Sequence, residues 1–594
     1  MSSTDFTSTE NGAVALKSSG NPIVDYFMMF ARTITNEKIE KYMDLCWDVN
    51  PKKTVAIIFN GRDRENGKKE KNISNRAMIW LRNNKPLTYQ GNLIKYIDKY
   101  GCWKDIMYIN FNFDKKVINC LDKDYELSII ANRLIKDKDT LENGNKNDIS
   151  LCAKWAPSEN DKYDKRRKSA KKVAAILFPD DLSHLMANYR KEYLTPLRNQ
   201  LKIVETLMCE NKWTEIKYET VPAVASKRLK KAFMKHDPDG YSKFLEDVKS
   251  GKKSIKVTGI LPHELIKYYI DLSANQYSFD ENNENKYEPN ETIEMQWKTI
   301  VENVKKEGVL EGLLPIVDVS GSMFSTSNGS IPAQVAIALG ILISDCSTGP
   351  FSNKVLTFSR KPEFYHVKGD TLFEKFNNIK SMDAGTDTNF EATSDLIINY
   401  GKMFNVKQED MPKKLVCLSD MQFNQASCDR KYKEISTLHK HIVNKYKNNN
   451  YEAPSFIYWN LNSDNNNDET FPVSSTEPGT ALISGFSEQL LKVFMKHDNF
   501  TPELIVDEIL SPYIDEVYID ESEYMKGGDY YPINNNMKEF KTQVNNELKE
   551  AENTTEDTVD DTAEDYSDMP DLIPDDEENT RPSLSLFNMF IRRT

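Results

Sequence analysis

The sequence predicts a mostly α-helical N-terminal domain followed by a doubly wound, Rossmann-like α/β domain. Apolar residues recur at helical spacing from residue 21 to about residue 275. From Leu313 onward, apolar strands alternate with helices, a pattern typical of β-α-β crossovers and a parallel sheet. The chain has 594 residues and is 39% hydrophobic, which allows several domains with buried cores.

Shifts in composition divide the chain into four parts. Residues 1–20 are polar and rich in Ser and Thr, so we expect a disordered tail. Residues 21–300 form the predicted basic helical domain, and residues 301–525 form the predicted α/β domain. Residues 526–594 are expected to be a linker and an acidic disordered tail, because residues 550–580 hold 14 acidic residues and no Lys or Arg.

The helical domain opens with Val24, Phe27, Met28 and Ala31, which share one face of a helix. Short polar joints separate the further helices that we expect. These cover residues 75–83, 92–100, 127–137, 171–177, 181–208 and 262–271. Packed helical hairpins fit this pattern, and a helical-repeat array is an alternative, although no clean sequence repeat is found.

The α/β domain is predicted from apolar runs that are bounded by turn residues. The expected strands are residues 313–319, 354–358, 363–367, 414–418, 455–460 and 480–484. The expected helices are residues 331–346, 371–379, 389–404, 432–445 and 488–495.

Composition also bears on the class of protein. No apolar run reaches 18 residues, and the N-terminus lacks the apolar core of a signal peptide, so we expect no membrane association. The 8 cysteines form no C-x-x-C pair, which argues against a disulfide scaffold or a zinc ribbon. Reduced thiols favour an intracellular, cytoplasmic protein.

Three groups of oxygen-bearing side chains follow predicted strands. Asp318, Ser320 and Ser322 alternate just past the first strand, so their side chains can point to one place. Thr386 lies in a Gly-Thr-Asp-Thr-Asn segment before a helix, and Asp420 follows the strand 414–418. Ligands of doubly wound sheets bind beyond the carboxyl ends of strands. Each residue alone could be a helix cap, but the set predicts a site for Mg²⁺ or another hard cation.

This arrangement resembles the metal-ion-dependent adhesion site of von Willebrand factor A domains, over residues 310–500. The resemblance implies that Asp318, Ser320, Ser322, Thr386 and Asp420 are ligands of Mg²⁺, or of Mn²⁺ or Ca²⁺. In the second loop, Asp387 or Thr388 could replace Thr386. The family binds protein ligands whose carboxylate completes the metal sphere, which implies a non-enzymatic binding protein with a protein partner.

A broader resemblance covers residues 20–525. It is to the domain of unknown function 2828, found in plants, fungi, slime moulds and giant viruses. The segments that carry it are residues 61–68, 100–105, 154–158, 189–208, 227–228, 419–423 and 484–487. The Asn- and Lys-rich composition resembles a mimivirus-like, giant-virus member, which implies host cytoplasm or virion. The layout is similar to the Ro autoantigen (TROVE) architecture, where a ring of helical repeats binds RNA beside an A domain.

Charge is distributed unevenly along the chain. The net charge of -13 combines +14 in residues 1–260, -16 in residues 261–549 and -11 in residues 550–594. The basic half could bind single-stranded RNA by neutralising phosphates and stacking bases; solvated helix faces and core aromatics are the alternative. The candidate basic residues are Lys165, Arg166, Arg167, Lys168, Lys227 and Arg228. The candidate stacking residues are Trp155, Tyr163, Tyr189, Tyr193, Trp213 and Phe233.

Enzymatic activity is the least favoured class. The sequence has no G-x-x-x-x-G-K-[ST], H-E-x-x-H or G-x-S-x-G motif. Ser320 has no evident His partner for nucleophilic catalysis. A metal-dependent phosphoryl-transfer enzyme built on Asp318 and Asp420 is the remaining alternative in this class.

Overall fold

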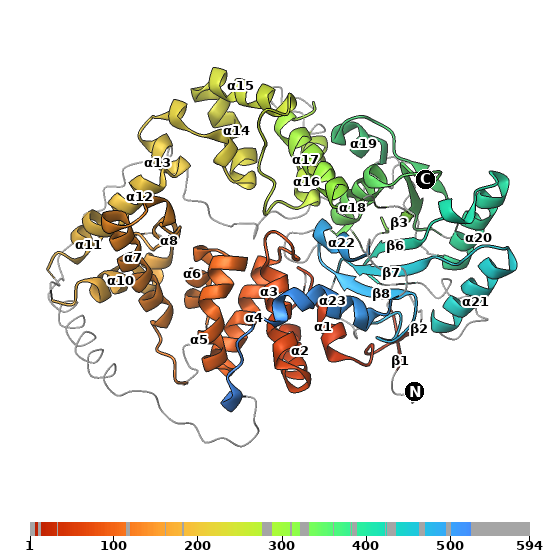
Figure 1. Ribbon diagram of the computed structural model, residues 1–594, viewed down its shortest axis with the longest axis horizontal. Coiled ribbons are helices and arrows are strands. Elements are labelled where there is room, and N and C mark those ends of the chain that lie inside the picture. Colours follow the sequence, from red (N-terminus) through yellow and green to blue (C-terminus); the bar gives the residue numbers. More distant parts are fainter. Residues whose placement is uncertain are drawn as a thin grey trace. The chain divides into compact units, whose positions relative to one another are not determined.

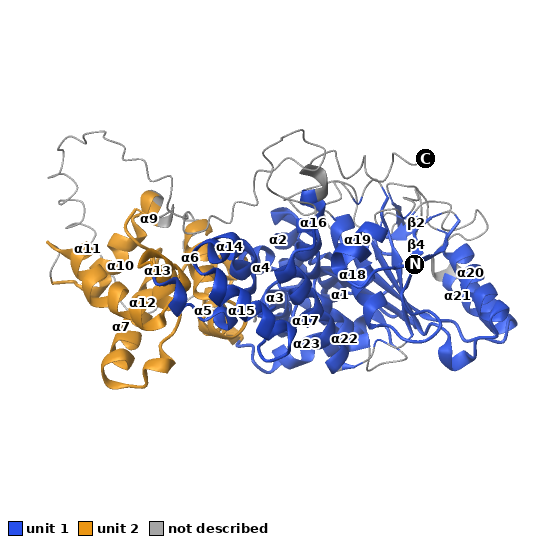
Figure 2. Ribbon diagram, turned by 90° about the horizontal axis from the view of Figure 1, so that it is seen from above, with its two compact units in different colours: residues 1–77, 212–518, 581–594 blue, residues 78–211, 519–580 orange. Residues whose placement is uncertain are grey.

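The computed structural model describes residues 6–523, with gaps at 10–13, 33, 114–118, 161, 181–182, 276–287, 309, 311, 321–322, 324–331, 360, 380–381, 383–388, 422, 424–434, 463–469 and 495–499. The predicted acidic tail therefore lies outside the described residues. The chain forms two compact units (Figure 2). Unit 1 combines the described parts of residues 1–77 and 212–518, and unit 2 combines residues 78–211 with residues 519–523.

The predicted fold class is confirmed: a helical N-terminal half precedes a six-stranded, mostly parallel α/β sheet. The helices before the sheet are α1 Pro22–Met29, α2 Asn36–Val49, α3 Pro51–Arg62, α4 Lys71–Asn84, α5 Pro86–Lys95, α6 Trp103–Asn112, α7 Tyr125–Asn143, α8 Cys152–Trp155, α9 Lys162–Arg167, α10 Ser169–Leu177, α11 Leu185–Asn188, α12 Thr195–Leu201, α13 Val204–Cys209, α14 Ala223–His236, α15 Pro238–Lys249, α16 Pro262–Asn275 and α17 Glu291–Glu307. Among the described residues, none of the helices combines the length and apolar character that crossing a membrane requires.

Two expectations for the N-terminal half are wrong. Within the tail expected to be disordered, β1 Phe6–Ser8 pairs antiparallel with β2 Val14–Leu16, and Leu16 bridges Phe471. The single helix expected over residues 181–208 is instead broken into α11, a π-helical segment Tyr189–Leu194, α12 and α13. The break after α12 falls at Lys202, whose φ of 45° lies in the left-handed region and ends the helix.

The sheet is doubly wound around its first strand. Its strands are β3 Leu313–Val317, β4 Lys354–Thr357, β5 Phe364–His366, β6 Lys414–Ser419, β7 Ser455–Asn460 and β8 Thr480–Ser484. Their order is β5-β4-β3-β6-β7-β8, with β5 alone antiparallel to its neighbour. The helices that accompany them are α18 Pro332–Cys346, α19 Leu372–Ile379, α20 Phe390–Met403, α21 Ile435–Asn448, α22 Leu491–Phe494 and α23 Pro502–Ile514.

Helices cover both faces of this sheet. In Figure 1, α1, α18 and α23 lie on one side of the strands, and α20 and α21 lie on the other. The helix α18 is buried along nearly its whole length, and a Cβ on Gly340 would lie 2.6 Å from Val317, so this glycine permits the close approach to β3. On the opposite face, Phe390 of α20 and His439 of α21 pack against Phe456 of β7.

The α3–α4 loop and α1 meet the last strand of the sheet within unit 1. Lys68 is fully buried, and its ammonium donates to the carbonyl of Phe27 (2.6 Å) and to the hydroxyl of Ser484 (2.8 Å). It also lies 3.7 Å from the centroid of the Phe27 ring. Burial holds the pKa of Lys68 well below its usual range, and Glu70 partly offsets this effect. The N-terminal helices are therefore part of the structure that covers β8.

Unit 2 has its own buried polar centre. Arg82 and Glu126 form an ion pair of 2.7 Å with side chains 2% and 0% exposed. The hydroxyl of Tyr89 also donates to Glu126 (2.9 Å), and the guanidinium of Arg82 lies 3.5 Å from the centroid of the Phe113 ring. Glu523 accepts hydrogen bonds from the first backbone amides of α5, so the segment after the sheet caps this helix.

Candidate functional site

Asp318 and Asp420 lie together at the carboxyl edge of the sheet. Asp318 directly follows β3 and Asp420 directly follows β6, and these strands are parallel neighbours with Val317 opposite Leu418. The amide of Asp318 donates to the carbonyl of Leu418 (3.1 Å). The chain runs from β3 to β4 on one side and returns to β6 on the other, so β3 and β6 flank the topological switch point. Ligands of open α/β sheets bind at this point.

The carboxylate of Asp318 is fixed by its neighbours. The amide of Ser320 donates to one of its oxygens (2.9 Å), and the hydroxyl of Ser419 donates to the other (2.8 Å). The hydroxyl of Ser320 forms a further hydrogen bond to the same side chain. Asp318 is 1% exposed and Asp420 is 2% exposed. Two carboxylates are therefore held in one buried place by backbone and hydroxyl donors.

The electrostatics of this site favour the binding of a cation. Burial, and then the negative charge of Asp420, raise the pKa of Asp318 to about 7. Burial, and then the charges of the same two carboxylates, raise the pKa of the Cys417 thiol. Two adjacent buried carboxylates repel each other unless a proton or a cation neutralises them, so a divalent cation could take the place of the proton.

The chemistry of the residues present fits a hard cation. Carboxylate and hydroxyl oxygens are the donors that Mg²⁺ prefers in proteins, and Asp318, Ser320 and Asp420 supply them here. Ser322 and the second-loop candidates Thr386, Asp387 and Thr388 lie outside the described residues. Over the described part of the chain, no group of three or more His, Cys, Asp or Glu side chains could hold a metal ion. The expected site differs from such a group because it has two carboxylates and takes its other oxygens from hydroxyls.

The candidate basic residues fall in both units, and those whose side chains the structure describes differ in exposure. Lys165 and Lys168 are exposed in unit 2, and the side chain of Arg166 lies outside the described residues. Arg167 is only half-exposed: it donates to the carbonyl of Asn110 and lies 4.8 Å from the centroid of the Phe111 ring. Arg167 therefore helps to hold α9 in place.

The second basic run belongs to unit 1. Arg228 is exposed on α14, whereas Lys227 is half-buried and donates to the carbonyl of Glu264. Lys230 of the same helix donates to Asn290 (2.9 Å). This run therefore combines two exposed cations, Arg228 and Lys231, with two lysines that tie α14 to neighbouring segments.

The stacking role expected for several aromatic residues is wrong. Tyr189 and Phe233 are 0% exposed, and Tyr193 is 9% exposed, so these rings belong to the core and cannot stack on bases. Trp213 is half-exposed but stacks on His236 with centroids 4.2 Å apart. Trp155 is half-exposed, and the ammonium groups of Lys104 and Lys154 lie 5.3 and 5.4 Å from the centroid of its ring. The side chain of Tyr163 lies outside the described residues.

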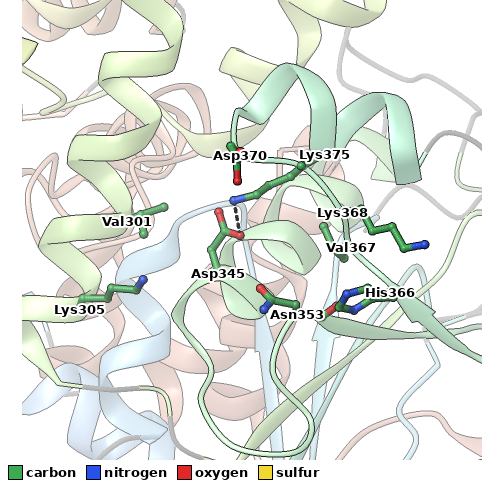
Figure 3. Close-up of a pocket in the computed structure, with 10 residues that line it drawn as sticks. Val301, Lys305, Asp345, Asn353, His366, Val367, Lys368, Asp370 and Lys375 are labelled. Atoms are coloured by element: carbon green, nitrogen blue, oxygen red, sulfur yellow. Dashed lines mark hydrogen bonds and ion pairs between the residues drawn. The ribbon is translucent and has the colours of Figure 1, made fainter.

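A separate polar hollow of about 520 Å³ lies at the opposite edge of the sheet (Figure 3). Asn353, which precedes β4, and His366, the last residue of β5, both line it. Lys375 and Asp345 point toward each other there and form an ion pair of 2.7 Å. Because this hollow lies at the amino end of β4, it is away from the edge where Asp318 and Asp420 lie.

Two segments quoted for the broader resemblance meet in the structure. Residues 61–68 lie in and after the end of α3, residues 484–487 follow β8, and Lys68 joins them through Ser484. The residues after each segment also pair, because Lys69 and Glu488 form an ion pair of 2.7 Å. Sequence reasoning missed this second buried polar cluster, although both segments that meet in it carry the broader resemblance.

The fold and site define an α/β protein with a helical N-terminal half and a pair of buried carboxylates at the switch point of its sheet. The sequence pattern of the domain of unknown function DUF2828 matches residues 9–120 and 127–310, and that of the domain of unknown function DUF7788 matches residues 313–545. The chain is 31% identical over 532 residues to uncharacterized protein L728 of Acanthamoeba polyphaga mimivirus, covering 85% of this chain and 87% of that protein. The chain belongs to the DUF2828 family.

Proposed function

We propose that this chain is a non-enzymatic binding protein with a divalent-metal-dependent adhesion site in its α/β domain. Asp318, Ser320 and Asp420 would hold Mg²⁺, Mn²⁺ or Ca²⁺, and Ser322 and Thr386 would complete the protein ligands. A carboxylate of a protein partner would bind the remaining position. The observation that carries the proposal is the pair of buried carboxylates at the switch point, where burial and mutual repulsion favour a cation.

The metal test compares Asp318→Asn with the wild-type chain. We expect Mg²⁺ to raise the melting temperature of the wild type, because a ligand that binds only the folded state stabilises it by about 2.7 kcal/mol at 100 times its Kd. The variant should lose this response while remaining folded, since it removes a buried charge and keeps the shape of the side chain. Asp370→Asn, at an exposed position, is the matched control. An unchanged response to Mg²⁺ in Asp318→Asn would disprove the metal site.

The partner test uses the same variants as bait. Proteins that bind through the metal should be captured by the wild type and Asp370→Asn with Mg²⁺, and lost with EDTA or with Asp318→Asn. Capture that is equal in all four conditions would show that binding does not use this site.

Single-stranded RNA binding is a second candidate function. It is supported by the exposed Lys165 and Lys168 of unit 2 and by the half-exposed Trp155, whose ring lies near the ammonium groups of two lysines. Stacking on one exposed ring, combined with phosphate neutralisation, is a known mode of sequence-tolerant binding. Filter binding at several salt concentrations, with Trp155→Ala as the variant and Trp213→Ala as the control, separates this function from the metal-dependent one.

A further inference from the structure

A polar cavity of about 410 Å³ lies in unit 1 beyond the carboxyl end of β8. The α3–α4 loop contributes Arg64 and Lys69 to its wall, the helical turn after β8 contributes Glu488 and Gln489, and α17 contributes Lys306. The strand β8 is parallel to β3, β6 and β7, so the cavity lies at the ligand-binding edge of the sheet. Its volume falls in the range of small-molecule sites, about 300–1,000 Å³.

Three residues that line this cavity each carry a buried polar atom that has no hydrogen-bond partner among the described residues. The second carboxylate oxygen of Glu488, the side-chain oxygen of Gln489 and the Nε of Arg64 are buried without a hydrogen bond. Glu488 is only 4% exposed, and its first carboxylate oxygen accepts from the ammonium of Lys69 (2.7 Å) and from the side-chain Nε2 of Gln489 (2.8 Å). Buried polar groups normally find partners, so unpaired ones in residues that line a cavity point to a ligand that pairs with them when these side chains adjust to it.

These atoms define the ligand's hydrogen-bonding groups. The oxygens of Glu488 and Gln489 accept, so they need hydroxyl or amino groups. The Nε of Arg64 donates, so it needs an anionic or carbonyl oxygen. Lys69 adopts a φ of 61°, a backbone conformation that is uncommon outside glycine, and this conformation accompanies its ion pair with Glu488 at the cavity wall.

Charge narrows the class of ligand further. The lining carries four cations and two carboxylates, an excess of two positive charges. A phosphate monoester carries about 1.5 to 2 negative charges at neutral pH and would match this excess, whereas a zwitterionic amino acid would not. We propose that this cavity binds a small phosphorylated polyol, such as a sugar phosphate, with its phosphate toward Arg64 and Lys306 and its hydroxyls toward Glu488 and Gln489.

The test is isothermal titration of the full chain with ribose 5-phosphate. Ribose, inorganic phosphate and glutamate are the comparison probes. We expect ribose 5-phosphate to bind at least tenfold more tightly than ribose or phosphate alone, because only it supplies both the hydroxyls and the anion. Arg64→Gln should weaken that binding at least tenfold. Lys298→Gln, on the exposed part of α17 and outside the cavity, should leave it unchanged.

A second cavity variant tests the proposal at an exposed position, where the substitution should not cause misfolding. Lys306 is exposed on α17, so Lys306→Gln should leave the fold intact while weakening the binding of ribose 5-phosphate several-fold. The proposal is overturned if ribose 5-phosphate fails to bind at millimolar concentration, or if glutamate or inorganic phosphate binds as tightly. It is also overturned if both cavity variants bind like the wild type. Because neither variant touches Asp318, the outcome is independent of the metal test.

Discussion

Lys68 is a buried cation whose hydrogen bonds go to neutral oxygens. Its ammonium donates to two main-chain carbonyls of the segment that ends α1 and to the hydroxyl of Ser484. An isolated buried charge is costly unless such partners satisfy it, and the lowered pKa of Lys68 expresses that cost. The aromatic ring of Phe27 adds a favourable cation–π contact.

We predict that Lys68→Met lowers the free energy of unfolding of unit 1. The loss should be about 2 kcal/mol or more, because the substitution removes the ammonium's hydrogen bonds and leaves buried carbonyls with fewer donors. Urea unfolding measures this difference. Lys52→Met, at an exposed position of α3, should change the same free energy by less than about 0.5 kcal/mol. Equal stability of the two variants would show that Lys68 contributes no net stabilisation.

At the scale of single elements, α21 contributes a buried histidine to the sheet. His439 packs edge-on against Phe456 and forms a hydrogen bond of 2.6 Å with the hydroxyl of Tyr458. Burial lowers the pKa of His439 to about 4. The folded protein therefore holds this imidazole neutral at pH values where the unfolded chain would protonate it.

We predict that this histidine makes the protein less stable as the pH falls. Between the unfolded pKa of about 6.5 and the folded pKa of about 4, the unfolded state binds one more proton, so the free energy of unfolding decreases with falling pH. Urea unfolding at pH 7 and pH 5 should show a smaller decrease for His439→Gln than for the wild type. His366→Gln, at an exposed histidine, should match the wild type, and a pH dependence unaltered by His439→Gln would contradict the assignment.

The basic helix α9 and Lys168, which follows it, carry two kinds of cation: exposed ones and one that packs against neighbouring residues. Lys165 and Lys168 are exposed, so neutralising both should reduce the salt dependence of RNA binding by about two units or less without destabilising unit 2. Arg167→Gln should instead lower the melting temperature of unit 2, because it removes contacts with Asn110 and the ring of Phe111. Thermal melts and filter binding on both variants check this. Destabilisation by the lysine pair alone would reverse the interpretation.

The sequence predicted those strands and helices whose apolar patterns and turn residues lie within one short stretch of chain. The strands at residues 455–460 and 480–484 coincide with β7 and β8, because each is a short apolar run between turn residues. The pairing of β1 with β2 was not predictable, since it is completed by the contact between Leu16 and Phe471 far along the chain. The breaks within residues 181–208 depend on the conformation of Lys202, which no periodicity reveals.

The candidate site likewise combines features that local sequence predicts with features that depend on tertiary packing. The places of Asp318 and Asp420 were predictable, because the carboxyl ends of adjacent parallel strands meet at one edge. The pairing of Lys69 with Glu488 was not, because it depends on how the α3–α4 loop packs beyond β8. The structural role of Arg167 was likewise hidden, since a basic run looks the same whether its members face solvent or a neighbouring helix.

At the scale of the whole molecule, the described part of unit 1 is built from two separate stretches of sequence. Residues 1–77 supply α1, α3 and Lys68, and residues 212–518 supply the sheet that they contact. Lys53 of α3 and Asp507 of α23 form a further link of 2.6 Å between the two stretches. The sheet therefore completes its packing with helices from the start of the chain.

We predict that a fragment of residues 301–523 does not fold as a stable domain. It lacks α1, α3 and the ammonium of Lys68, so it would expose the apolar surface beside β8 and leave the hydroxyl of Ser484 with fewer partners. Limited proteolysis and thermal melts should show early cleavage and no cooperative transition. A chain of residues 1–523, which keeps every described contact, is the control; a cooperative melt of the short fragment would refute the prediction.

The buried ammonium at Lys68 also has an evolutionary consequence. The two sequence patterns abut between residues 310 and 313, but Lys68 lies in the first pattern and its partner Ser484 in the second. A gene that inherited only the second pattern would encode a sheet without the cation and the helix that cover its last strand. Recombination at that junction should therefore succeed only when both parental genes preserve this contact, so substitutions at positions 68 and 484 should be coupled among the descendants.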